Sequence, residues 1–257
     1  MPTIMCPKTL LSAMAFFICS LLVSRVQADV VSVAVAANFT APAKEIAEAF
    51  AQETGHRAVL SFGSTGKLYA QIAHGAPFQV FLSADRDRAQ LVIDKNLAID
   101  GTRMTYAVGH IVLYSSDPHL VDASGRVLHS DRYVKLAIAN PNTAPYGRAA
   151  MEAVKNLGLY ERVRNRFVQG ESVSQAHQFV ATGNAQLGFI AHSLVQKSAH
   201  GSIWKVPKEL YSPIEQDAVL LSSGLNHKAA TAFLEFLGSV QVKEIVAKFG
   251  YDLGLPH

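Results

Sequence analysis

The sequence has 257 residues, of which 49% are hydrophobic and 17% are charged, and 23 Lys and Arg against 20 Asp and Glu give a formal net charge of +3. This composition excludes a disordered chain, and the near balance of charge lacks the basic face that nucleic acid requires, so we expect no nucleic-acid partner. The length is compatible with one large domain or two smaller ones.

Residues 1–28 are expected to be a cleaved signal peptide. The apolar run over residues 10–23 is too short for the roughly 20 residues that span a membrane, and residues 26–28 have the small-x-small pattern of a cleavage site. Cys6 and Cys19 leave with this segment, so the remaining chain is expected to contain no disulfide, thiol nucleophile or cysteine metal ligand. An exported chain without cysteine is predicted to reside in a bacterial periplasm.

Strand and helix patterns then alternate along the chain. β-branched runs bounded by small residues predict buried strands, and apolar residues at helical spacing before glycine predict helices. Because the order is βαβαβ, we predict a parallel sheet with helices on its faces. The predicted strands are residues 30–36, 58–62 and 79–83, and the predicted helices are residues 43–54, 67–74 and 87–95.

A long extended segment, residues 104–114, is predicted to cross into a second α/β lobe, because it is longer than the usual strand of 5–6 residues. A second extended segment, residues 214–221, is predicted to carry the chain back, so that the C-terminal helices rejoin the first lobe. We therefore predict an α/β protein with residues 29–108 and 222–257 in lobe one and residues 109–221 in lobe two.

Motifs for catalysis and for metal binding are missing from the sequence. The turn at residues 63–67 lacks the flanking positions of a phosphate-binding P-loop, and the ten histidines show no His-x-x-x-His spacing. Carboxylate pairs such as Asp85 and Asp87 stand on polar segments that are typical of solvated faces. We therefore expect a protein that is not an enzyme, with no cofactor and no metal cation.

Four times, a predicted strand runs into a short turn and then into a helix start. Each helix start has unpaired N–H donors and the positive end of the helix dipole, and such ends line the ligand crevice of open α/β sheets. Two starts from each lobe facing one cleft would form an anion site without a cation, although ordinary N-capping explains each start taken singly. The four junctions are residues 36–38, 63–66, 144–147 and 171–174.

Six segments carry a family resemblance, in order, over nearly all of residues 29–257. They are VAVAANFTAPAKEIAEAF, SFGSTGKLYAQIAHGAPFQVFLSAD, YAVGHIVLYS, IANPNTAPYGRAA, ESVSQAHQFVATGNAQLGFIA and KFGYDLG. Together they resemble the periplasmic molybdate-binding proteins of ABC importers. The resemblance implies a two-lobed periplasmic-binding-protein (venus-flytrap) fold with two hinge crossings, which closes over one tetrahedral oxyanion, molybdate or tungstate.

The same resemblance implies the contact residues, with two departures. Ala37 and Asn38 have no hydroxyl where other members have Thr or Ser, so the first contact must use the backbone or the amide of Asn38. Ala191 stands where one branch uses a Tyr hydroxyl, so that contact is absent. The positions that match family contacts are Asn38, Ser64, Thr65 and the backbone N–H groups of Tyr146 and Val173.

The implied partner is the permease of an ABC importer in the inner membrane, served by a monomeric binding protein. A site made only of donors disfavours hydrogenphosphate unless a carboxylate accepts its proton, and Glu171 is the acid near these motifs. Sulfate or thiosulfate remains an alternative ligand, because sulfate is also a dianion. An enzyme on the same fold and an interaction protein that senses a ligand without transport remain alternative classes.

Overall fold

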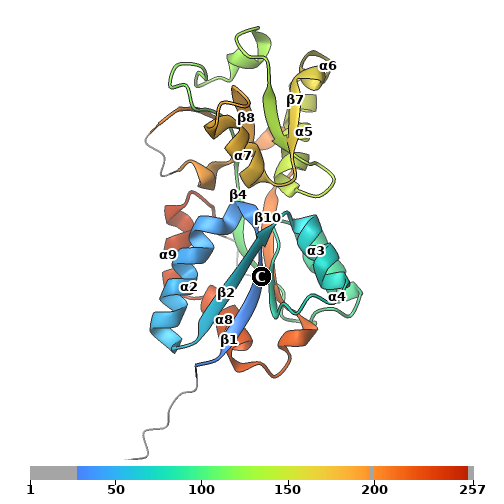
Figure 1. Cartoon of the computed structure of the whole chain (residues 1–257), viewed down its shortest axis with the longest axis vertical. Helices are drawn as coiled ribbons and strands as arrows, with labels where there is room; N and C mark the ends of the chain where they lie inside the picture. Colours follow the sequence, from blue (N-terminus) through green and yellow to red (C-terminus); the bar gives the residue numbers. More distant parts are fainter. Residues whose placement is uncertain (1–27, 197–199, 254–257) are drawn as a thin grey trace, which may run out of the picture.

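The computed structural model describes residues 28–196 and 200–253, so the expected signal peptide falls outside them except for its last residue. Two α/β lobes are stacked along the long axis of the molecule (Figure 1). Within the described residues, no helix combines the length and the apolar character needed to cross a membrane. The predicted α/β fold with two lobes is confirmed.

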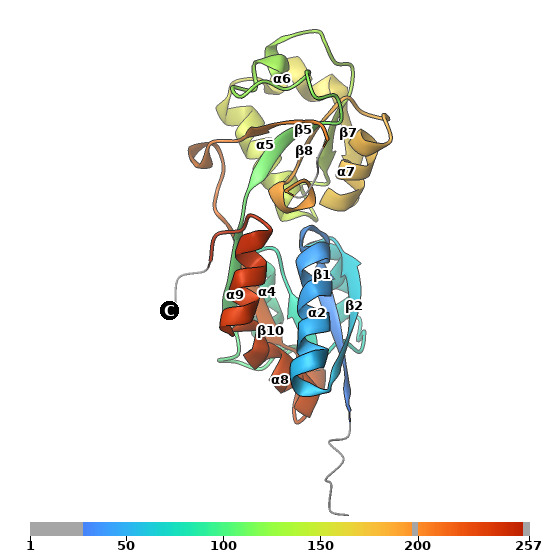
Figure 2. The ribbon, with the colours of Figure 1, turned by 90° about the vertical axis from the view of Figure 1, so that its left-hand side faces the viewer.

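The first lobe is a five-stranded sheet in the order β2-β1-β3-β10-β4, covered by helices on both faces. Its elements are β1 (Val30–Ala36), η1 (Ala37–Phe39), α2 (Thr40–Thr54), β2 (Arg57–Gly63), α3 (Thr65–Ala73), β3 (Val80–Leu82), α4 (Arg86–Asp94), β4 (Met104–Gly109), β10 (Ile214–Leu220), η6 (Ser222–Gly224), α8 (Lys228–Leu237) and α9 (Val240–Lys248). Val33 and Val35 of β1 pack with α2, α8 and α9, whereas Ala34 packs on the side of α3 and α4. This alternation explains why a strand buried on both faces is continuously apolar. Helices α8 and α9 lie on the same side of the sheet as α2 (Figure 2).

The second lobe is a five-stranded sheet in the order β7-β6-β8-β5-β9. Its elements are β5 (Ile111–Ser115), η2 (Arg126–His129), β6 (Leu136–Ala139), α5 (Pro145–Asn156), α6 (Tyr160–Val163), η3 (Arg164–Arg166), β7 (Phe167–Gly170), α7 (Val173–Ala181), β8 (Leu187–Ala191), η4 (His192–Leu194), β9 (Ser202–Lys205) and η5 (Lys208–Leu210). β6 runs parallel to β7 and β8, and β5 runs antiparallel to β8 and β9. The lobe therefore has its own sheet and its own core.

Two connections join the lobes. The first is His110, which separates β4 from β5, so the single strand predicted over residues 104–114 is two strands in different sheets. The second leads from β9 through η5 to β10. β10 pairs with β3 and β4, so residues 214–220 belong to the first sheet, whereas the predicted boundary placed them in lobe two. The apolar residues of β10 suit either core, and only its hydrogen-bonded partners decide which sheet it joins.

The start of α2 differs from the prediction and matters for the site. The helix begins at Thr40 and not at residue 43, because the short turn η1 leads directly into it. The Thr40 hydroxyl donates to the carbonyl oxygen of Ala37 at 2.8 Å, and Pro42 falls in the first turn, where its missing N–H is tolerated. Gly55 ends the helix in the left-handed region with φ 73°, as the sequence predicts.

Candidate binding site between the lobes

Four helix starts meet at the boundary between the lobes: η1 and α3 from the first, α5 and α7 from the second. The backbone N–H of Gly66 donates to the carbonyl oxygen of Thr143 at 2.8 Å, which joins the start of α3 to the loop before α5. The Ser174 hydroxyl donates to the carbonyl oxygen of Ala37 at 2.9 Å, which joins α7 to η1. The five predicted site residues are almost fully buried at this boundary: Asn38 is 2% exposed, Ser64 4%, Thr65 1%, Tyr146 2% and Val173 3%.

Ser64 has the most informative side chain at the boundary. It occupies the N-cap position of α3, but its hydroxyl caps no N–H group of the helix. The Ser64 Oγ is buried and has no hydrogen-bond partner among the described residues. Next to it, the Thr65 Oγ1 accepts from the backbone N–H of Ala84 at 3.1 Å, which leaves the hydroxyl hydrogen of Thr65 free to donate. The start of α3 therefore presents two hydroxyl donors to a ligand.

Tyr146 presents a backbone donor at the start of α5. Pro145 has no N–H group, and the N–H groups of Gly147 and Arg148 both donate to the carbonyl oxygen of Ala144, at 2.9 and 3.1 Å. The N–H of Tyr146 is thus the first-turn donor of α5 that remains for a ligand. A Cβ at Gly147 would lie 2.3 Å from the carbonyl oxygen of Ala139, which explains the small residue after Tyr146.

Val173 presents the corresponding donor at the start of α7. The Ser172 hydroxyl caps the helix by accepting from the N–H of Gln175 at 3.3 Å, and the Gln175 side chain accepts from the N–H of Glu171 at 2.6 Å. These bonds occupy the neighbouring donors and leave the N–H of Val173 without an intrahelical partner. The side chain of Val173 packs in the core of the second lobe and fixes the helix start.

Asn38 uses its side chain to hold the site together. Its Nδ2 donates to the Gln216 Oε1 at 2.8 Å and to the Tyr251 hydroxyl at 3.0 Å. Its carbonyl oxygen accepts from the Ser193 hydroxyl of the second lobe at 2.9 Å. Of the two possibilities that the sequence left open for Asn38, the amide is engaged with protein groups, and the backbone N–H at the helix start is the donor that remains.

Gln216 and Tyr251 contact the candidate site residues, and the sequence analysis did not single them out. Gln216 is fully buried, and its Nε2 donates to the Tyr146 hydroxyl at 3.2 Å while its Oε1 accepts from Asn38. It therefore links a site residue of one lobe to a site residue of the other. Burial raises the pKa of the Tyr251 phenol to about 12, and burial likewise raises the pKa of the Tyr146 phenol well above its usual range, so both are neutral at pH 7. The available signal was weak, because Gln216 stands between Glu215 and Asp217 in β10, and polar residues in such a run usually face solvent.

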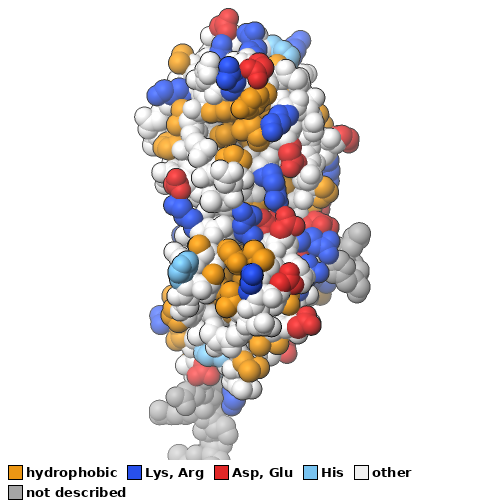
Figure 3. All heavy atoms as spheres, turned by 90° about the vertical axis from the view of Figure 1, so that its right-hand side faces the viewer, with side chains coloured by type: hydrophobic (Ala, Val, Ile, Leu, Met, Phe, Trp, Pro, Cys, Tyr) orange, Lys and Arg blue, Asp and Glu red, His pale blue; other side chains and the backbone are white. Residues whose placement is uncertain are grey.

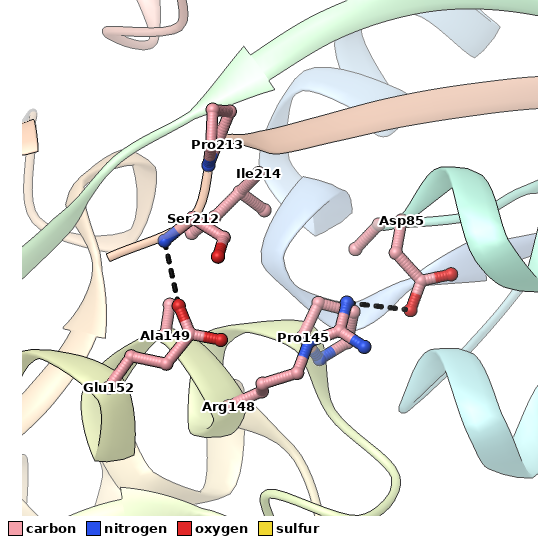
Figure 4. A pocket seen from close by; sticks show the side chains of 9 residues that line it. Asp85, Pro145, Arg148, Ala149, Glu152, Ser212, Pro213 and Ile214 are labelled. Atoms are coloured by element: carbon pink, nitrogen blue, oxygen red, sulfur yellow. Dashed lines mark hydrogen bonds and ion pairs between the residues drawn. The ribbon is translucent and has the colours of Figure 1, made fainter.

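Charged side chains lie at the rim of the site. Lys67 pairs with Glu171 across the boundary at 2.7 Å, and the two side chains are 52% and 57% exposed. Arg148 of α5 points toward Asp85 of the first lobe at 3.8 Å (Figure 4) and pairs with Asp87 at 3.2 Å. Figure 3 shows basic and acidic side chains beside one another at the level where the lobes meet. Glu171, the acid near the site motifs, is thus paired with a surface lysine.

The electrostatic character of the site follows from its helix starts. Each start contributes a partial positive charge, and small anions bind such ends without a counter-cation. In the described part of the chain, no group of three or more His, Cys, Asp or Glu residues is placed to hold a metal ion. Two lobes that bury neutral donors between them are the arrangement of a solute-binding protein.

The comparisons identify the family. The model of the bacterial extracellular solute-binding proteins matches residues 31–252, and the chain belongs to this family. It is 49% identical to the molybdate-binding protein ModA of Azotobacter vinelandii over 91% of this chain and 94% of that protein. It is 50% identical to the molybdate-binding protein ModA of Rhodobacter capsulatus over 85% of this chain and 86% of that protein.

A solved structure supports the same assignment. The periplasmic molybdate-binding protein of Azotobacter vinelandii superimposes with a TM-score of 0.85 and 38% identity, covering 88% of this chain and all of that chain. The resemblance that the sequence motifs carry is therefore confirmed, and so is the venus-flytrap fold.

Proposed function

We propose that this protein captures molybdate in the periplasm and delivers it to an ABC importer. The observation that carries the proposal is the buried Ser64 hydroxyl, which lacks a partner at a helix start where two lobes meet. An unsatisfied buried hydroxyl costs roughly 1–3 kcal/mol, so a ligand oxygen is its natural partner. Similarity to two molybdate-binding proteins supports the choice of anion.

In the proposed binding mode, the anion receives hydrogen bonds from both lobes. The first lobe contributes the backbone N–H of Asn38 and the hydroxyls of Ser64 and Thr65. The second contributes the backbone N–H groups of Tyr146 and Val173. Hydrogen bonds from neutral donors to an ionised acceptor are the stronger class, and helix starts stabilise the charge without bringing a cation.

The donors also favour a particular protonation state of the bound anion. A full dianion accepts at every oxygen, whereas hydrogenphosphate carries an O–H that needs an acceptor, and an unpaired O–H is penalised when buried. Because Glu171 is paired with Lys67 at the rim, the site favours molybdate over hydrogenphosphate. Tungstate has the same charge and tetrahedral shape, so we propose that it binds as well.

Sulfate or thiosulfate is the alternative ligand. Sulfate carries the same charge as molybdate, so the donors alone do not reject it. We propose that size does, since the smaller anion would reach fewer of the donors on the two lobes at once.

Delivery is proposed to use the rims of both lobes. A permease that touches both rims can distinguish the ligand-bound arrangement from one with the lobes apart. We propose a monomer that is exported with cleavage of residues 1–28 and is not an enzyme.

Thermal unfolding of residues 29–257 with molybdate, tungstate, sulfate or phosphate tests the proposal. Ligand at 100 times its Kd stabilises a protein by about 2.7 kcal/mol, and each kcal/mol raises Tm by roughly 2–4 °C for a chain of this size. We expect a rise of several degrees with molybdate and tungstate only. A rise with sulfate alone would establish the alternative ligand, and no rise with any of the four would overturn the proposal.

A further inference from the structure

Two serines of the second lobe bind consecutive carbonyl groups of the first lobe. The Ser174 hydroxyl, in the first turn of α7, donates to the carbonyl oxygen of Ala37 at 2.9 Å. The Ser193 hydroxyl, in η4, donates to the carbonyl oxygen of Asn38, also at 2.9 Å. Both hydrogen bonds cross the boundary between the lobes, so they exist only while the lobes are together.

The Ser174 bond acts on the peptide unit that contains the Asn38 N–H. The carbonyl of Ala37 and the N–H of Asn38 belong to one planar trans unit, so they point in opposite directions. A hydroxyl that holds the carbonyl therefore also fixes the direction of the N–H. Hydrogen bonding at the carbonyl polarises the unit and makes the N–H a better donor.

We propose that Ser174 and Ser193 are positioning residues that keep the Asn38 N–H against the bound anion, Ser174 by holding the peptide unit of that N–H and Ser193 by holding the next unit, and that they thereby slow release of the anion. The inference rests on the proposed function, in which this N–H is a ligand donor. The bonds form on closure, so their loss speeds anion release and leaves association and the stability of the ligand-free protein unchanged.

The two serines are not equivalent. The Tyr251 hydroxyl lies 2.9 Å from the carbonyl oxygen of Asn38 and 2.9 Å from the Ser193 Oγ, so it can donate to this carbonyl when Ser193 is removed. The carbonyl oxygen of Ala37 also accepts a hydrogen bond from the Thr40 hydroxyl, which belongs to the same lobe. Ser174 holds the peptide unit that contains the Asn38 N–H, whereas Ser193 holds the following unit, so removal of the Ser174 hydroxyl has the larger effect.

The test is the rate at which labelled molybdate leaves the protein when excess unlabelled molybdate is added, together with the association rate and the Tm without ligand. The variants are Ser174→Ala, Ser193→Ala and Ser174→Thr, which keeps the hydroxyl. Ser130→Ala is the matched control, because its hydroxyl donates to the Val127 carbonyl oxygen at 2.8 Å within one lobe.

We expect Ser174→Ala to release molybdate about five- to tenfold faster, which is the effect of about one hydrogen bond. We expect a smaller effect for Ser193→Ala and wild-type release for Ser174→Thr and for the Ser130→Ala control. Wild-type release from Ser174→Ala, or a loss confined to the association rate, would overturn the inference alone. Failure of the wild-type protein to retain molybdate would overturn the proposed function and this inference with it.

Discussion

Gly66 of the first lobe and Thr143 of the second meet backbone to backbone, with the N–H of Gly66 donating to the Thr143 carbonyl oxygen at 2.8 Å. A Cβ at position 66 would lie 3.0 Å from both the Cα and the carbonyl oxygen of Thr143. The contact lies one residue from Thr65, so a change at Gly66 acts on the spacing of the lobes directly beside the proposed site.

Gly66→Ala is expected to separate stability from affinity. In the ligand-free protein, alanine in α3 stabilises the helix by up to about 1 kcal/mol relative to glycine. With the lobes together, the added methyl group overpacks the contact, and overpacking typically costs 1–3 kcal/mol. Urea unfolding should show equal or greater stability, and calorimetry should show molybdate affinity reduced about tenfold. Unchanged affinity would mean that the ligand-bound lobes do not approach as closely here.

Ser64→Ala is expected to lower affinity without lowering stability. The Ser64 hydroxyl makes no hydrogen bond to the described residues, whereas a hydrogen bond to a charged ligand is worth about 1.5–3 kcal/mol. Ser239→Ala is the matched control, because Ser239 caps α9 by accepting from the N–H of Val242. That control should lose about 0.5–2 kcal/mol of stability and no affinity. Calorimetry and urea unfolding of both variants distinguish a ligand contact from a helix cap. Wild-type molybdate affinity in Ser64→Ala would contradict the proposed contact between Ser64 and the anion.

Tyr146→Phe is expected to show the opposite pattern. The phenol oxygen accepts a hydrogen bond from the Gln216 Nε2 at 3.2 Å. Its removal leaves the buried Gln216 amide without this acceptor, which should lower the free energy of unfolding by roughly 1–3 kcal/mol. The ligand contact is the backbone N–H, which the substitution keeps, so molybdate affinity should change little. A large loss of affinity at unchanged stability would instead place the phenol on the anion.

Acid sensitivity is expected from the half-buried His177. Burial lowers the pKa of His177 from its usual value of 6.5, so the imidazole stays neutral in the folded protein at a pH where the unfolded chain takes up a proton. The unfolded state then binds more protons, and the free energy of unfolding falls as the pH drops below about 6.5. The decline ends once the pH is below the folded-state pKa.

His177→Gln should make the free energy of unfolding less dependent on pH between 7 and 5, as measured by urea unfolding at several pH values. The dependence is not abolished, because burial also lowers the pKa of His192. An unchanged slope would show that His177 is protonated equally in both states.

The positions of the site residues were predictable because they follow local rules. Each candidate residue stands where an apolar strand passes through a turn into a helix, and neighbouring residues in the sequence determine those turns. The residues are Asn38, Ser64, Tyr146 and Val173. The family motifs then distinguished these helix starts from ordinary caps. The free hydroxyl of Ser64 was not predictable, because whether a serine caps its helix depends on the rotamer that the fold selects.

The groups that hold the site together could not be read from the sequence. Gln216 lies 178 residues from Asn38, and Ser174 lies 137 residues from Ala37, so these pairs exist only once both sheets are formed. The same long-range dependence explains β10, whose apolar residues suit either lobe until its ladder with β3 and β4 assigns it to the first.

The most direct measurement is a crystal structure grown with molybdate, with the molybdenum located by its anomalous scattering. We expect one strong peak between the starts of η1, α3, α5 and α7. We also expect an anion oxygen within about 2.5–3.0 Å of the Ser64 Oγ, and others within about 2.7–3.2 Å of the backbone nitrogens of Tyr146 and Val173. Molybdenum beside Lys67 or Arg148 at the rim, without an anion oxygen on the Ser64 hydroxyl, would contradict the proposed binding mode.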